Sequence, residues 1–147
     1  ASPHAWNIVN IDGAPYQLDV TWDIGMGGQR KGAVVYAYFN LTDELMHQDH
    51  RADSRLPECR AKAANYYVQS RCSFQMKQKL IAYIDKQIDQ NEKTVVFRAE
   101  GRLNKGGIEK EAADYILKKL QRKGRWGGIR TYSNKKLGIY RIEIISR

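Results

Sequence analysis

The stretch HAWNIVNIDGAPYQLDVTWD, residues 4–23, contains two segments in which polar and apolar side chains alternate. These segments, 5–11 and 16–22, are rich in β-branched and aromatic residues, which favour strands. The dipeptide Asp12-Gly13 lies between them and is a strong signal for a tight turn. The sequence therefore predicts a β-hairpin near the start of the chain.

The turn also predicts which side chains of the hairpin are neighbours. A two-residue loop places His4 opposite Thr21 and puts Asp19 on the same face, with the Cα atoms of His4 and Asp19 roughly 7–8 Å apart. Trp6 then lies directly opposite Asp19, whereas Trp22 is predicted to point to the other face. A carboxylate beside an imidazole fixes its tautomer and leaves the second ring nitrogen for a nucleophile, although such a pair can also be a plain surface contact.

The remaining pattern of hairpins mixed with helices predicts an α+β fold. We expect an antiparallel sheet with the His/Asp hairpin, helices, and a C-terminal β-α-β-β portion. Residues 1–92 are predicted to form the portion of the domain that carries the His/Asp hairpin. Residues 93–147 are predicted to form a basic extension that is either separate or part of the same compact domain. The predicted elements after the hairpin are a glycine-rich loop at 25–32, a strand at 33–40, a helix capped by Thr42, helices at 57–69, 74–90 and 108–122, and strands at 93–101, 129–133 and 137–145.

Positive charge is concentrated in the last third of the chain. The 147 residues carry a net charge of +9, and residues 1–95 contain 11 basic and 11 acidic side chains, so the excess lies in 96–147. Such asymmetry favours either a solvated basic surface or contact with an anionic polymer. No nucleic-acid-binding motif is present, so we do not expect a nucleic acid partner. The candidate polyanion contacts are Lys118, Lys119, Arg122, Lys123 and Arg125.

Other classes of site find little support in the sequence. No segment approaches the ~20 apolar residues of a membrane span. The two cysteines, Cys59 and Cys72, have no zinc-ligand or disulfide-framework spacing. His47, Asp49 and His50 resemble a metal-ligand cluster, but they lie in a polar stretch and we expect them to be solvated. We therefore predict no metal and no cofactor.

The stretch HAWN followed by DVTWD resembles the His and Asp motifs of the transglutaminase-like superfamily, particularly its bacterial members. YFNLTDELMHQDH, residues 38–50, is similar to the segment that follows in this family, and weaker similarity extends to about residue 72. The resemblance implies a papain-like Cys-His-Asp mechanism on peptide or protein amide groups, by hydrolysis or transamidation. His4 would be the base, Asp19 the residue that orients it, and Trp6 a wall of the substrate pocket.

The resemblance also implies a nucleophilic cysteine upstream of His4, at the N-terminus of a helix. The sequence begins three residues before His4, so we expect a fragment that lacks this cysteine and is inactive alone. Neither Cys59 nor Cys72 is expected to replace it. The exposed sheet of such a fragment favours homodimers, and the bacterial resemblance implies an extracellular or cell-surface location. The alternatives are a non-catalytic module that binds a peptide or protein, and a basic domain that binds an anionic polymer.

Overall fold

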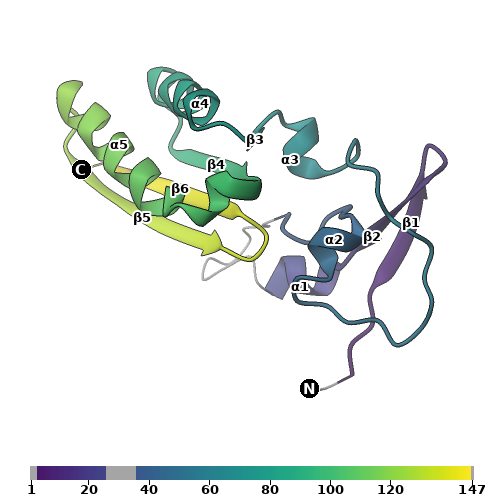
Figure 1. Ribbon diagram of the computed structural model, residues 1–147. Helices are drawn as coiled ribbons and strands as arrows, with labels where there is room; N and C mark the ends of the chain where they lie inside the picture. The colour runs from purple at the N-terminus through teal and green to yellow at the C-terminus, as the bar shows by residue number, and fades with distance from the viewer. Residues whose placement is uncertain (1–2, 26–35, 147) are drawn as a thin grey trace. The chain divides into compact units, whose positions relative to one another are not determined.

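The computed structural model describes residues 3–25 and 36–146, and the chain forms two compact units, Ala1–Arg71 and Cys72–Arg147. A two-stranded antiparallel sheet and a mixed four-stranded sheet occur together with helices, so the predicted α+β fold is confirmed (Figure 1). The division between the units falls earlier than the boundary predicted at residues 92 and 93. The difference arises because a helix that precedes this boundary packs on the later strands.

The predicted hairpin opens the first unit. β1 (Asn7–Ile11) and β2 (Ala14–Leu18) are antiparallel, and Ile11 pairs with Ala14 across the turn. Asp12 and Gly13 both have positive φ, at 52° and 82°, as expected for a type I′ turn. The predicted register is therefore confirmed.

The second strand ends earlier than predicted. It stops at Leu18, and α1 (Val20–Gly25) replaces the extended backbone expected up to residue 22. Asp19 explains the change, because its Oδ1 accepts a hydrogen bond of 3.0 Å from the backbone N–H of Trp22 in the first turn of the helix. A carboxylate in this position caps the helix N-terminus, and this local bond outweighs the β-propensity of Val, Thr and Trp.

The segment after α1 is only partly as predicted. Residues 36–40 contain a turn and a bend and not a strand. The rest of the expected strand, and the glycine-rich loop apart from Gly25, lie outside the described residues. The segment nevertheless lies along β2, because Leu41 exchanges two backbone hydrogen bonds with Gln17. Thr42 caps α2 (Asp43–Met46) as predicted, since its side chain accepts from the N–H of Leu45.

The helix predicted over 57–69 is mostly wrong. Only α3 (Tyr66–Gln69) is helical, and Asn65 is its N-cap. The preceding backbone is held by Asp43, whose N–H donates to the carbonyl of Cys59 at 2.8 Å and whose Oδ2 accepts from the N–H of Cys59 at 3.1 Å. These tertiary bonds satisfy backbone groups that a helix would otherwise pair internally.

The second unit contains a four-stranded sheet with two helices on one face (Figure 1). The sheet order is β3-β4-β6-β5, in which β3 pairs with β4 in parallel and the other pairs are antiparallel. The core packs Leu80, Ile84 and Ile88 of α4 with α5 and with Val95 and Phe97 of the sheet. The elements are β3 (Ser73–Phe74), α4 (Lys77–Asp89), β4 (Thr94–Ala99), the 3-10 helix η1 (Gly101–Lys105), α5 (Ile108–Arg122), β5 (Gly127–Asn134) and β6 (Ile139–Ser146). The predicted β-α-β-β portion, from β4 to β6, is confirmed.

Gly138 is the position of this unit that tolerates a side chain least. Its φ is +72°, and a Cβ atom there would lie 2.2 Å from the carbonyl oxygen of Ala99. Gly124 has a similar φ of +67° but open space around its Cα.

We expect Gly124→Ala to cost about 1–2 kcal/mol of unfolding free energy from backbone strain alone. Gly138→Ala should cost clearly more, because the backbone of β4 must also move. Denaturant unfolding of both variants measures the two losses of unfolding free energy. Equal losses would contradict the close approach of position 138 to the carbonyl oxygen of Ala99.

Candidate active site

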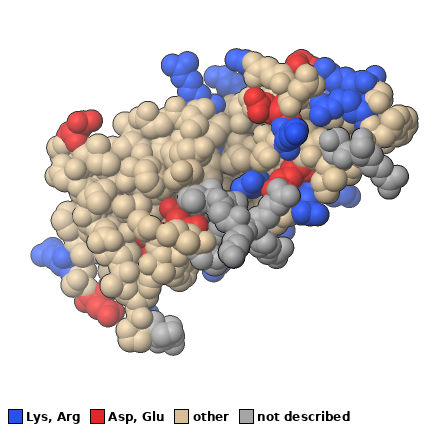
Figure 2. All heavy atoms as spheres, turned by 180° about the vertical axis from the view of Figure 1, so that it is seen from behind, with Lys and Arg blue, Asp and Glu red and all other residues tan. Residues whose placement is uncertain are grey.

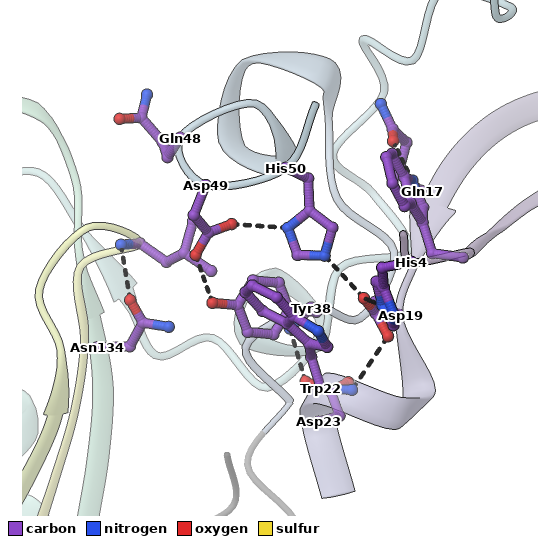
Figure 3. A network of polar contacts seen from close by, with 12 residues as sticks. His4, Gln17, Asp19, Trp22, Asp23, Tyr38, Gln48, Asp49, His50 and Asn134 are labelled. Carbon is purple, nitrogen blue, oxygen red and sulfur yellow. Dashed lines mark hydrogen bonds and ion pairs between the residues drawn. The ribbon is translucent and has the colours of Figure 1, made fainter. Parts of the chain in front are cut away.

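The carboxylate of Asp19 is the centre of the candidate site. Its side chain is 1% exposed, and its Oδ2 lies 2.6 Å from His4 Nε2 and 2.7 Å from His50 Nε2. Its Oδ1 accepts from the backbone N–H of Trp22. Figure 3 shows this network, with His50 lying between Asp49 and Asp19.

Burial would raise the pKa of Asp19, because it disfavours the charged form. Hydrogen bonds from His50, from the N–H of Trp22 and from His4 outweigh this effect and lower the pKa below its ordinary value. Asp19 is therefore an ionised carboxylate at neutral pH, which is the form that stabilises a neighbouring imidazolium.

The predicted pair of His4 and Asp19 is brought into direct contact, although neither residue lies in a strand. His4 precedes β1 and Asp19 follows β2, so the hairpin register sets both. The contact uses Nε2 of His4, and its Nδ1 has no hydrogen-bond partner among residues 3–25 and 36–146. The side chain of His4 is 29% exposed, the largest exposed fraction among His4, Asp19 and His50.

His50 is a residue of the candidate site that the sequence interpretation missed. It was expected to be solvated, but its side chain is 2% exposed, and its Nδ1 lies 2.7 Å from Asp49 Oδ1. Asp49 in turn accepts a hydrogen bond of 2.5 Å from the hydroxyl of Tyr38. Because both ring nitrogens face carboxylates, His50 is held rigidly and fixes the position of Asp19. His47, which was grouped with it, is exposed.

Two tryptophans surround the histidines. Trp6 donates from Nε1 to Gln17 at 2.8 Å, and its ring centroid lies 4.9 Å from that of His50 in a T-shaped arrangement. The prediction that Trp22 points away is wrong, because its ring centroid lies 4.2 Å from that of His50 and 5.7 Å from that of His4. The helical turn after Asp19 causes this, since it removes the strand alternation on which the prediction depended.

The two cysteines are poor nucleophiles. Burial, together with the carboxylate of Asp43, raises the pKa of Cys59 to about 11, and burial raises the pKa of Cys72 to about 11. The thiolate is the reactive form of cysteine, and it is scarce at neutral pH for both residues. Neither thiol has the electropositive surroundings of a catalytic cysteine.

The predicted polyanion contacts do not form a uniform cationic surface. Lys119 lies 2.9 Å from Asp85 and 3.2 Å from Asp89, and Lys123 lies 2.7 Å from Asp89. Acidic groups therefore neutralise two of the five candidates, while Lys118, Arg122 and Arg125 have no ion pair within the part of the chain that the structure describes. Figure 2 shows Lys and Arg side chains gathered on the second unit, at the right of that view, with acidic side chains among them.

A comparison of the chain with protein-family models gave no match, and neither did a comparison with curated protein sequences. In the described residues, no helix has the length and apolar character that crossing a membrane requires.

Asp23 gives the first unit a testable pH dependence. It is 4% exposed, and burial raises its pKa to about 7 even though the N–H of Tyr38 donates to it at 2.7 Å. Between about pH 4 and pH 7 the native state then binds more protons than the unfolded state, so stability falls as pH rises. We expect Asp23→Asn to remove this slope and to be the more stable protein at pH 8. Urea unfolding at pH 5 and pH 8 measures the effect.

The matched control is Asp12→Asn, which removes a carboxylate from the exposed hairpin turn. It accounts for the change in net charge alone. Parallel pH profiles for the wild type and Asp23→Asn would show that this carboxyl group does not titrate in the expected range.

Proposed function

We propose that this site is the base and orienting part of a transglutaminase-like cysteine hydrolase or acyltransferase, acting on amide groups of peptides or proteins. One observation carries the proposal: His4 Nε2 lies 2.6 Å from the buried carboxylate of Asp19, while Nδ1 has no hydrogen-bond partner within the part of the chain that the structure describes. In a nucleophilic site, a carboxylate on one nitrogen fixes the imidazole tautomer, and the other nitrogen exchanges a proton with the nucleophile.

In this mechanism His4 Nδ1 takes the proton of a cysteine thiol, and Asp19 stabilises the resulting imidazolium. The thiolate attacks the amide carbonyl carbon to give a tetrahedral intermediate. When the carbon–nitrogen bond breaks, His4 returns the proton to the departing nitrogen, and a thioester remains. Water or an amine then attacks the thioester, with Nδ1 accepting its proton, so the thiol is regenerated.

The nucleophile of the proposal is a cysteine from outside these 147 residues, as the family resemblance implies. The raised pKa values of Cys59 and Cys72, both about 11, argue against either residue in this role. Burial of Asp19 and its second bond to His50 support the proposal as well, because a rigid carboxylate keeps His4 in one orientation.

The two alternatives make different demands on these residues. A non-catalytic binding module needs the shape of the site but no proton transfer at His4. A polyanion-binding domain needs free cationic groups, and the ion pairs of Lys119 and Lys123 with acidic residues weaken that reading.

The test uses a polypeptide in which this chain is joined to the cysteine-bearing segment that the resemblance implies. We expect His4→Ala to lower kcat by about 10³-fold or more, and Asp19→Asn to have an effect of similar order, because both remove the oriented base. Ammonia release from a glutamine-containing peptide measures attack on the carboxamide, and incorporation of a labelled amine separates transamidation from hydrolysis.

His47→Ala is the matched control, because it removes an exposed histidine near the same site. It should retain full activity. Equal turnover by His4→Ala and His47→Ala would contradict the proposed base. Peptide binding without turnover, unchanged by His4→Ala, would favour the non-catalytic module instead.

A further inference from the structure

Three potential metal ligands meet at the candidate site. One donor atom from each of His4, Asp19 and His50 lies within 4.8 Å of the other two. Two imidazole nitrogens and one carboxylate oxygen are a donor set that suits zinc and other divalent transition metals. We propose that these three residues form a binding site for such an ion, with Zn²⁺ as the best match.

The spacing of the donors shows how an ion would enter. Zinc binds imidazole nitrogen and carboxylate oxygen at roughly 2.0–2.2 Å, so neighbouring ligands of a tetrahedral site are about 3.3 Å apart. The two Nε2–Oδ2 distances are now 2.6 and 2.7 Å, which are hydrogen-bond lengths. Each of the two distances must therefore lengthen by roughly 0.6 Å, so both imidazole rings must shift slightly away from Asp19 Oδ2. His4 has the most room to move, because its side chain is 29% exposed while those of Asp19 and His50 are 1% and 2% exposed.

The groups around the donors already have the arrangement of an outer ligand shell. Asp49 binds Nδ1 of His50 and leaves its Nε2 for the ion, as carboxylates do behind histidine ligands in zinc proteins. The N–H of Trp22 binds Oδ1 of Asp19 and leaves Oδ2. Three protein ligands leave a fourth position for water or another molecule, on the exposed side of His4.

The metal would also compete with the reaction described above. It would occupy Nε2 of His4 and Oδ2 of Asp19, the two atoms that form the proposed base pair, so zinc would inhibit catalysis. This consequence rests on the proposed function, whereas the binding site does not.

The binding test needs only the metal-free 147-residue chain. Titration calorimetry with Zn²⁺ should give one ion per chain, and Co²⁺ should produce the visible absorption bands of a four-coordinate site. His4→Ala should weaken binding by at least about 10-fold, and so should Asp49→Asn, which removes the outer carboxylate. His47→Ala should bind as the wild type does. Circular dichroism confirms that each variant is folded.

His4→Ala is the decisive variant, because its side chain is the most exposed of the three ligands and its removal leaves the buried pair intact. Absence of stoichiometric Zn²⁺ binding to the wild type overturns the proposal. Equal affinity of His4→Ala and His47→Ala also overturns it, since the ion would then lie elsewhere. If zinc binds as expected but His4→Ala retains full turnover in the longer polypeptide, the proposed function fails and the metal site stands.

Discussion

The buried carboxylate of Asp19 is the interaction on which the first unit depends. An ionised carboxylate loses its hydration on burial, and that cost is offset only where hydrogen-bond donors replace the water. Three donors do so, the N–H of Trp22 in α1 and the rings of His4 and His50. The same group therefore ends β2, begins α1 and fixes both histidines. Local structure and site chemistry cannot be changed independently at this residue.

The parts of the fold that the sequence predicts correctly are those decided by local interactions. Asp12-Gly13 sets the hairpin register because few residues adopt positive φ twice in succession. The helices over 77–89 and 108–122 follow from apolar residues at helical spacing. The errors at 36–40 and 57–65 occur where backbone groups bond to distant parts of the chain, and such bonds leave no periodic pattern.

The candidate site shows the same division between local and tertiary effects. Hairpin parity is enough to bring His4 and Asp19 to one face, so this pair could be predicted. The orientation of Trp22 could not be predicted from strand alternation, because Asp19 begins a helix and the alternation ends before Trp22. His50 lies far along the chain in a polar stretch, and a polar stretch ordinarily indicates solvation. Only the burial of its ring between two carboxylates places it in the candidate site.

Two histidines share one carboxylate, yet their surroundings give them different chemistry. Both ring nitrogens of His50 face carboxylates, those of Asp49 and Asp19, and its side chain is 2% exposed. His4 is bonded to Asp19 through Nε2, its Nδ1 has no hydrogen-bond partner in residues 3–25 and 36–146, and its side chain is 29% exposed. In the proposed reaction His4 is the residue that exchanges a proton, and at the proposed metal site it is the ligand with the most room to move. In both proposals the buried ring of His50 stays beside Asp19.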